Sequence, residues 1–236
     1  MNPIYKNYEH YINEKSSTIK KSFLFLDKKL SALEIERNAR LLDIGCAAGE
    51  LIRFLKSRYP DIQYVGIDIF DDLLAKAKEE VSDAYFENVS VLDISDKYNN
   101  VFDLITVFGV IGIFDDKNLD RFFSNILSWL KPGGRCYIFE PFNNYGMDLI
   151  SKHRKTINGV QGDWELGNSV FSIETVKRLL NGRCKHYSFD RFDIGMPLKR
   201  SSDPQRTWTI ECEDNKYQLT NGLKLLFDIY LLEIIK

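Results

Sequence analysis

Apolar residues in this chain fall into short buried-type runs that alternate with segments of helical spacing. The first run, residues 41–44, is followed by Gly45 and Gly49 and then by an apolar-periodic stretch that begins at Leu51. This order predicts a buried strand, a tight turn and the start of a helix. Glycines suit such a turn because the backbone bends sharply there and can come close to a ligand.

Further apolar segments follow in the order expected of an α/β protein. Residues 64–68 and 101–110 have the composition of buried strands, and the run that starts at Asp71 has helical spacing. An amphipathic helix is predicted over residues 119–130, and the Lys-Pro-Gly-Gly sequence at 131–134 ends it.

The N-terminal part is predicted to be helical. Between residues 4 and 37, apolar side chains recur every three or four positions with lysines between them: Ile19, Phe23, Leu26, Leu30 and Leu33. We expect a helical cap, residues 1–38, before the first strand.

The region after residue 140 has a less regular pattern. We expect a loop and a helix over residues 141–155, and a helix over residues 173–180 that Ser172 caps and Gly182 ends. The remaining expected elements are a strand over residues 184–194, a hairpin over residues 206–219 that turns at Asp214 and Asn215, and a final strand over residues 225–235.

Composition narrows the functional class. The 236 residues are 44% hydrophobic and 13% aromatic, which suits a single α/β domain with additions. The net charge is −2 with both signs mixed throughout, so the basic footprint of a nucleic-acid-binding protein is missing. No run reaches the length of a membrane span, and the N-terminus has no apolar core segment. We therefore expect a soluble cytoplasmic protein with no nucleic-acid or membrane partner.

The four cysteines point away from metal and disulfide chemistry. Cys46, Cys136, Cys184 and Cys212 are scattered without C-x-x-C spacing. Buried thiols are the favoured interpretation, and no metal requirement is expected.

The details of the first turn indicate which ligand it serves. A dinucleotide loop has the pattern G-x-G-x-x-G, whereas this turn has D-x-G-x-x-x-G from Asp43 to Gly49. No pyrophosphate fingerprint is present, and the carboxylate of Asp43 at the strand end suits a ligand with a cationic amino-acid tail. The pattern resembles the first motif of class I S-adenosylmethionine-dependent methyltransferases.

That resemblance implies roles for the residues of the turn. Asp43 would face the amino end of the methionyl group, while Gly45, Cys46, Ala47 and Gly49 would line the cofactor. Ala47 stands where the family usually has its central glycine.

Asp68 ends the second predicted strand, roughly 20 residues past the glycines, where a carboxylate can accept the ribose hydroxyls. A helix N-cap is the alternative role, but Asp71 and Asp72 are expected to fill it. Ile69 would lie against the adenine.

Two further cofactor contacts follow from the resemblance. Near the third strand, either Ser90, followed by Val91, or the later Asp93 would receive the adenine amino group, and both options stay open. After the fourth strand, Phe108, Gly109 and Val110 would form the floor beneath the sulfonium.

The turn, Asp68, the fourth strand and the Lys-Pro-Gly-Gly stop recur in the family's order across residues 41–140. The resemblance implies a Rossmann-like, mostly parallel seven-stranded sheet with an antiparallel final strand and helices on both faces. Residues 39–236 would form one methyltransferase domain, with acceptor-side insertions over residues 141–222. The cofactor would be S-adenosyl-L-methionine and the product S-adenosyl-L-homocysteine.

The acceptor side carries a looser resemblance. The segments FNNYGMDLI, WELGNSVFS and DPQRTWT resemble a bacterial subgroup of methyltransferases linked to surface polysaccharide or glycan synthesis. This favours a small-molecule acceptor, with a sugar hydroxyl first and a phosphate-type oxygen second.

Candidate acceptor residues are drawn from the same segments and from the N-terminal tyrosines. His153 is a candidate general base, with a surface histidine as the alternative. Arg154 and Arg206 are candidates for holding a phosphate, or for structural ion pairs. Trp164 would stack on a sugar or would pack, and Tyr8 would touch the ligand or pack. Asp148 is a further candidate in these segments, with no specific role indicated.

Other functions remain open at this point. A protein or RNA methyltransferase is the first alternative, and a non-catalytic S-adenosylmethionine-binding sensor or partner subunit is the second. An NAD-dependent dehydrogenase is a distant third. The loop after the fourth strand lacks the Asn/Asp-Pro-Pro-aromatic motif that DNA amine methyltransferases carry.

Overall fold

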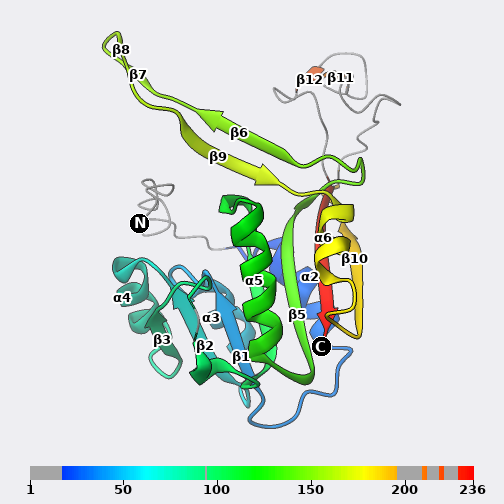
Figure 1. The fold of residues 1–236 in the computed structure, drawn as a ribbon. Helices are drawn as coiled ribbons and strands as arrows, with labels where there is room; N and C mark the ends of the chain where they lie inside the picture. Colours follow the sequence, from blue (N-terminus) through cyan, green and yellow to red (C-terminus); the bar gives the residue numbers. More distant parts are fainter. Residues whose placement is uncertain (1–17, 94, 196–208, 212–217, 221–227) are drawn as a thin grey trace.

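The computed structural model describes residues 18–93, 95–195, 209–211, 218–220 and 228–236. Its centre is a seven-stranded sheet in the order β10-β13-β5-β4-β1-β2-β3 (Figure 1). The sheet strands are β1 (Arg40–Ile44), β2 (Gln63–Asp68), β3 (Tyr85–Asn88), β4 (Phe102–Phe108), β5 (Leu130–Phe142), β10 (His186–Phe192) and β13 (Asp228–Ile235).

The pairing of these strands confirms the predicted fold class. β1 pairs in parallel with β2 and β4, β2 with β3, and β4 with β5. β13 runs antiparallel to both of its neighbours, β5 and β10. The result is a mostly parallel, Rossmann-like sheet whose parallel strands end along one edge, where ligands bind in folds of this kind.

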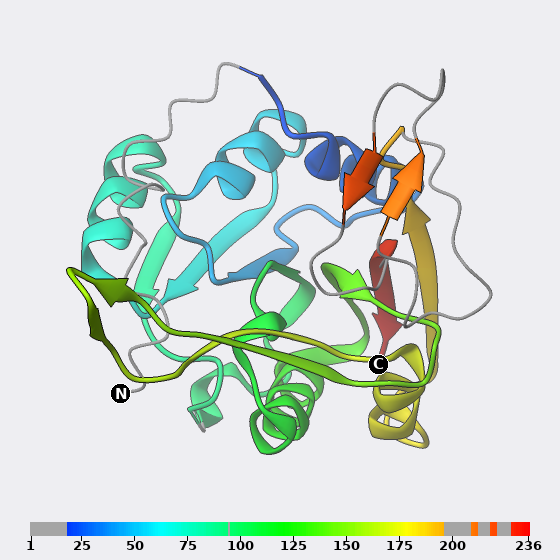
Figure 2. The ribbon, with the colours of Figure 1, turned by 90° about the horizontal axis from the view of Figure 1, so that it is seen from above.

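Helices cover both faces of the sheet, as Figure 2 shows from above. The helices are α2 (Lys21–Leu30), α3 (Glu50–Arg58), α4 (Asp71–Glu80), α5 (Asp116–Trp129) and α6 (Ile173–Leu180), with short 3-10 turns η1 (Asp96–Tyr98) and η2 (Ile111–Ile113). One core cluster joins the sheet to α2, α3 and α4 through side chains such as Leu26, Leu55 and Leu74. The other joins it to α5 and α6 through Phe122, Trp129 and Leu180. Because apolar side chains cover both faces, the parallel strands read as near-continuous apolar runs.

Helix α2 is shorter than the expected N-terminal helix. Within the described residues it spans only Lys21–Leu30, and the chain turns at Ser31. Leu33, which continued the apolar period, packs against the core from beyond the helix. The apolar spacing correctly predicted that Leu33 is in the core, but Leu33 lies in the turn that follows the helix and not in the helix itself. Residues 1–17 lie outside the described residues.

Helix α6 agrees with the sequence prediction at both ends. The Ser172 side chain accepts a hydrogen bond from the Thr175 N–H at 3.1 Å, and Gly182 has a φ of 71° just past the end. The cap at the start and the glycine after the end therefore fix the bounds that the sequence indicated.

The expected loop is present at residues 143–148, but the helix expected after it within residues 141–155 is wrong. This region forms β6 (Leu149–His153), which pairs antiparallel with β9 (Glu165–Val170), and the ladder continues into β7 (Thr156–Ile157) and β8 (Val160–Gln161). In both views this hairpin leaves the end of β5 and runs above α5 toward the side of α4 (Figures 1 and 2). We call residues 149–170 the arm.

The second expected hairpin is present as a pair of short strands. β11 (Thr209–Glu211) runs antiparallel to β12 (Gln218–Thr220), and the predicted turn between them lies outside the described residues. No helix in the described part of the chain is long and apolar enough to cross a membrane.

Candidate active site

The first turn joins β1 to α3 at the carboxyl edge of the sheet. The N–H groups of Gly45 and Cys46 donate to the Ile67 carbonyl at 2.8 and 3.1 Å, and the Gly49 N–H donates to the Cys46 carbonyl at 2.9 Å. Gly45, Ala47 and Gly49 have φ values of 70°, 46° and 78°. The turn therefore depends on three left-handed residues, and only Ala47 among them carries a side chain.

Close packing explains the glycine at position 45. A Cβ built on Gly45 would lie 2.5 Å from Val110 Cγ2, so the turn packs directly on the second residue after β4. Gly49 is less tight, with Ala77 Cβ of α4 at 3.2 Å from its ideal Cβ. The structure thus brings together Gly45 and Val110, two residues that the resemblance assigned separately to the cofactor.

Cys46 contributes packing and backbone. Its Sγ lies against Gly66 of β2, where an added Cβ would come within 2.8 Å of the sulfur. The side chain is buried, and burial raises the pKa of its thiol. A neutral thiol in this position is a structural group, as the scattered cysteines predicted.

Asp68 ties the tip of β2 to the first turn. Its Oδ2 accepts from the Ala47 N–H at 2.9 Å, and its Oδ1 accepts from the N–H groups of Ile69 and Phe70 at 2.7 and 3.2 Å. The side chain is 8% exposed; burial raises its pKa, while the three amides oppose that rise. A carboxylate offers about four acceptor positions, so at least one stays open for a ligand hydroxyl.

The expected helix cap by Asp71 and Asp72 is wrong. The N-cap position of α4 is Phe70, and no side-chain cap bond is made there. The Phe70 N–H, at the head of α4, instead donates to Asp68. Asp68 thus accepts a hydrogen bond at the head of α4 without being its N-cap residue, and its ribose role stays a prediction.

Asp43 is a second buried carboxyl group beneath the turn. It is 3% exposed and accepts a hydrogen bond from the Thr106 hydroxyl at 2.8 Å. Burial raises its pKa to about 7, the Thr106 bond lowers it, and the nearby Asp68 charge raises it further. A cation placed near Asp43 and Asp68 would favour their charged forms.

The loop after β3 brings both adenine candidates into one turn. The Asp93 N–H donates to the Ser90 carbonyl at 2.9 Å, and the Asp93 carboxylate reaches back to within 3.4 Å of the Ser90 N–H. Val91 is buried. Ile69 is exposed at the tip of β2.

The end of β4 is held by contacts between aromatic rings. The Phe108 ring stacks on Phe139 at 5.2 Å between centroids and meets the edge of Phe23 of α2 at 6.1 Å. Gly109 follows with a φ of 72° and donates to the Phe139 carbonyl at 3.2 Å.

Sequence reasoning missed Glu140, which lies at the carboxyl end of β5. It is 4% exposed and accepts from the Ile111 N–H at 2.8 Å. Burial raises the pKa of Glu140 to about 7, while hydrogen bonds from the backbone amides of Ile111, Val110 and Gly112 lower it. Glu140 therefore clamps the turn η2 beneath the site. The signal for it was a lone carboxylate inside the apolar run CYIFEPF.

The acceptor-side candidates lie on the arm or next to it. His153 Nε2 is 3.8 Å from Glu165 Oε2, and the Arg154 guanidinium lies 4.8 Å from the centre of the Trp164 ring. Asp148 has a structural contact, because it accepts from the Ser172 N–H and the Thr175 hydroxyl at 2.7 and 2.6 Å.

Arg154 and Trp164, chosen separately from the sequence, are thus one stacked pair, and the Trp164 side chain is 60% exposed. Tyr8 and Arg206 lie outside the described residues.

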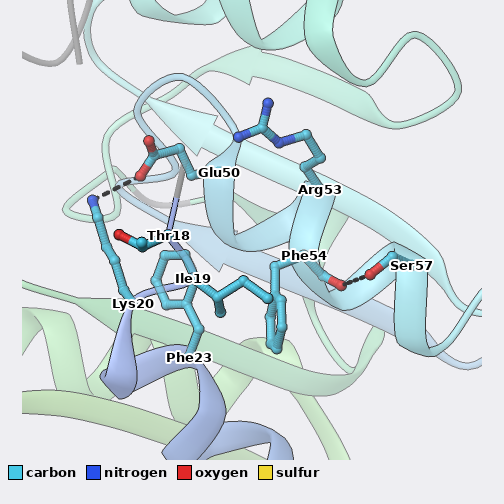
Figure 3. Close-up of a pocket in the computed structure, with 8 residues that line it drawn as sticks. All are labelled: Thr18, Ile19, Lys20, Phe23, Glu50, Arg53, Phe54 and Ser57. Carbon is cyan, nitrogen blue, oxygen red and sulfur yellow. Dashed lines mark hydrogen bonds and ion pairs between the residues drawn. The ribbon is translucent and has the colours of Figure 1, made fainter. Parts of the chain in front are cut away.

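A hollow of about 290 Å³ opens between the start of α2 and α3 (Figure 3). The Lys20 ammonium crosses it to Glu50 at 2.7 Å, at the head of α3. Its lining residues are Thr18, Ile19, Lys20, Phe23, Glu50, Arg53, Phe54 and Ser57. The hollow adjoins the first turn through Glu50, the first residue of α3.

Within the described ranges, no group of three or more His, Cys, Asp or Glu side chains is placed to hold a metal ion. The polar groups at the carboxyl edge of the sheet are instead carboxyl groups and backbone amides around a glycine-rich turn. This set fits a ligand with hydroxyls and a cationic tail.

Comparison with known proteins agrees with this chemistry. The sequence model of the family described as methyltransferase domain matches residues 42–136. Malonyl-[acyl-carrier protein] O-methyltransferase 2 of Ilyobacter polytropus is 23% identical over 185 residues, which cover 76% of this chain and 65% of that protein. The chain spans less than two thirds of the length of the first curated relatives it matches.

Solved structures share the fold. The YcgJ protein from Bacillus subtilis matches with a TM-score of 0.62 and 14% identity, over 92% of this chain and 99% of that one. A phosphoethanolamine N-methyltransferase from Haemonchus contortus, in complex with phosphomonomethylethanolamine and S-adenosylhomocysteine, matches with a TM-score of 0.56 and 19% identity. That match covers 72% of this chain and 39% of the other.

Proposed function

We propose that this chain is a class I S-adenosylmethionine-dependent methyltransferase that transfers a methyl group from S-adenosylmethionine to an oxygen of a small-molecule acceptor. The observation that carries the proposal is the left-handed turn between β1 and α3, flanked by the buried carboxyl groups of Asp43 and Asp68.

Each part of the cofactor has a proposed partner in this site. Asp68 would receive the ribose hydroxyls through its open acceptor position, and exposed Ile69 would lie against the adenine. Asp43 would face the methionyl ammonium from beneath the turn, while Gly45, Cys46, Ala47 and Gly49 would present backbone to the ligand.

The turn of Ser90 and Asp93, with Val91 between them, would meet the adenine amino group. Its two polar residues already contact each other, so the adenine would find both candidates at one place.

The end of β4 would form the floor beneath the reacting group. Phe108 is fixed by its stack on Phe139, and Val110 is fixed against Gly45. A rigid floor favours transfer because the acceptor has to be held in line within roughly 3 to 3.5 Å of the methyl carbon.

When bound, S-adenosylmethionine supplies an electrophilic methyl group on a sulfonium. The acceptor oxygen would form the new bond to the methyl carbon, and the electron pair of the broken C–S bond would stay on sulfur. The acceptor proton would pass to the proposed base His153 from a sugar hydroxyl, or to water from a more acidic oxygen. S-adenosylhomocysteine remains. The chain's own residues therefore chiefly bind and orient, and a base is needed only for a weakly acidic hydroxyl.

We propose a sugar or glycan-precursor hydroxyl as the favoured acceptor and a phosphate-type oxygen as the second. The exposed pair of Arg154 and Trp164 supports both, since an indole can stack on a sugar face and a guanidinium can hold a phosphate. His153, beside this pair, is the proposed base.

The test is incubation of the pure protein with methyl-labelled S-adenosylmethionine and an extract of its source cells, followed by separation of the label by size and charge. We expect label in small anionic metabolites. Label in protein or RNA would contradict the small-molecule acceptor, and no transfer with cofactor still bound would indicate a non-catalytic binder. Asp68→Ala is the matched control, which should transfer no label to any fraction.

A further inference from the structure

Asn168 of the arm lies directly against the turn η2. A Cβ built on Gly112 would overlap Asn168 Oδ1 and would lie 3.2 Å from Asn168 Cγ. Any larger residue at position 112 would therefore displace the carboxamide. The glycine leaves room for this side chain, and β9 packs on η2 at this point.

The backbone of Asn168 is held by a side chain from the facing strand. The Asn168 N–H donates to Ser151 Oγ at 2.8 Å, and the Ser151 hydroxyl donates to the Asn168 carbonyl at 3.1 Å. The strand register shifts between Ser151 and Lys152. Bulges of this kind re-aim side chains next to active sites.

The carboxamide of Asn168 makes no hydrogen bond to any other residue that the structure describes, and the residue is exposed. The Asn168 backbone N–H and carbonyl are thus both held by Ser151, and the carboxamide rests against Gly112 without a hydrogen-bond partner among the described residues. A side chain in this state can bind a ligand without first breaking a protein contact.

The turn beneath Asn168 is continuous with the proposed floor of the transfer site. Val110 packs on Gly45 of the first turn, and Gly112 follows two residues later beneath the carboxamide. Glu140 fixes the residue between them through the Ile111 N–H. Asn168 of the arm therefore lies next to the proposed floor, where β9 packs on η2.

We propose that Asn168 orients the acceptor by hydrogen-bonding through its carboxamide to two neighbouring oxygens of a polyhydroxylated small molecule. A carboxamide donates from nitrogen and accepts at oxygen, so it can hold two adjacent hydroxyls at once. It is neutral and takes no proton, so Asn168 acts on the geometry of the acceptor. This inference rests on the proposed methyl transfer and names the acceptor class for the same site.

The test compares initial rates of label transfer from methyl-labelled S-adenosylmethionine to serial dilutions of the low-molecular-mass fraction of the source-cell extract. Asn168→Ala is expected to lower the rate at limiting acceptor at least about tenfold, equivalent to one lost hydrogen-bonding pair. Its affinity for S-adenosylhomocysteine should stay within about twofold of the unmodified protein, because Asn168 lies beyond the cofactor residues.

Two further variants sharpen the result. Asn168→Asp keeps the size and the acceptor but loses the donor, and should retain an intermediate rate even if the alanine variant folds poorly. Gly112→Ala should reproduce the loss seen with Asn168→Ala, because the methyl group displaces the carboxamide. Asn181→Ala, which removes a carboxamide just beyond α6, is the matched control and should transfer at the unmodified rate.

An unchanged rate for Asn168→Ala, with transfer by the unmodified protein intact, would overturn the role of Asn168 and leave the methyltransferase proposal standing. Absence of transfer by the unmodified protein to every fraction would overturn both.

Discussion

The first turn and the arm face the same edge of the sheet but are built in opposite ways. The turn is stabilised by buried carboxyl groups, left-handed residues and packing with no spare room around Gly45. The arm is a two-stranded ladder whose strands pair only with each other in the described residues, and Ile157 near its tip is 64% exposed. The difference suggests a division of labour in which one region binds a constant ligand and the other adapts to an acceptor.

The largest difference between the two regions is expected for glycine substitutions. Gly45→Ala combines a left-handed backbone with a Cβ 2.5 Å from Val110, so we expect it to lower the free energy of unfolding by about 2 to 5 kcal/mol. The melting temperature should fall by at least about 5 °C. Gly159→Ala, which has a φ of 79° and open space around it on the arm, is the matched control.

Thermal unfolding followed by circular dichroism measures both variants. The control should melt within about 2 °C of the unmodified protein, because strain at the arm's turn does not reach the core. Equal losses in the two variants would contradict the contrast between the regions.

The reverse pattern is expected for Trp164→Ala on the arm. Because the ring is 60% exposed, its loss should leave the melting temperature and the affinity for S-adenosylhomocysteine unchanged. Transfer to the acceptor should fall about tenfold through loss of the stacking face. Ile157→Ala, also exposed on the arm, should change none of the three quantities. Weakened cofactor binding in Trp164→Ala would show that the two regions are not separate.

Cofactor affinity should depend on pH through Asp43, whose pKa is about 7. Above pH 7 its carboxylate would attract the methionyl ammonium, as proposed, and below pH 7 the carboxyl group is mostly neutral. We therefore expect the affinity for S-adenosylhomocysteine to rise about tenfold between pH 6 and pH 8. Calorimetric titration across this range measures it, and Asp43→Asn should flatten the profile. A profile that stays equally steep in the variant would assign the titration to another group, such as Glu140.

The same raised pKa acts on stability with a defined sign. Between the ordinary pKa of 3.8 and about 7, the folded protein holds a proton on Asp43 that the unfolded chain releases. The free energy of unfolding of the cofactor-free protein should therefore decline as pH rises through this window. Urea titrations at pH 5 and pH 7 measure the decline, which Asp43→Asn should reduce.

The smallest expected effect is a gain in stability from a substitution in the first turn. Ala47 has a φ of 46°, so Ala47→Gly should relieve left-handed strain and raise the free energy of unfolding by about 1 kcal/mol or less. The melting temperature should rise by about 2 to 4 °C. Asn158→Gly, at a φ of 51° on the arm, should leave the melting temperature unchanged. A loss of stability in Ala47→Gly would mean that the methyl group contributes packing that outweighs the strain.

The sequence predicted the turn region far better than the arm, for a physical reason. Between residues 41 and 110, burial on both faces favours apolar strands, and left-handed backbone at residues 45 and 49 favours glycine, so the local sequence pattern predicts these elements. The cap of α6 at Ser172 was predicted on the same grounds, since a helix end needs a partner for its free amides.

The sequence pattern of the arm does not predict its strands in this way. Its strands have little buried surface, so polar and apolar residues do not alternate cleanly across Leu149–His153, and a bulge interrupts the register. Glu140 and Asn168 were missed for a related reason. Each acts through contacts between segments distant along the chain, and no local spacing encodes those contacts.

The central claim is tested most directly by calorimetric titration of S-adenosylhomocysteine into the unmodified protein and into Asp68→Ala, side by side at pH 8. We predict one binding site in the unmodified protein and an affinity at least about tenfold weaker in the variant, from loss of the charged hydrogen-bond acceptor. Absence of binding to the unmodified protein, or equal affinity in the two, would contradict the assignment of this edge of the sheet as the cofactor site.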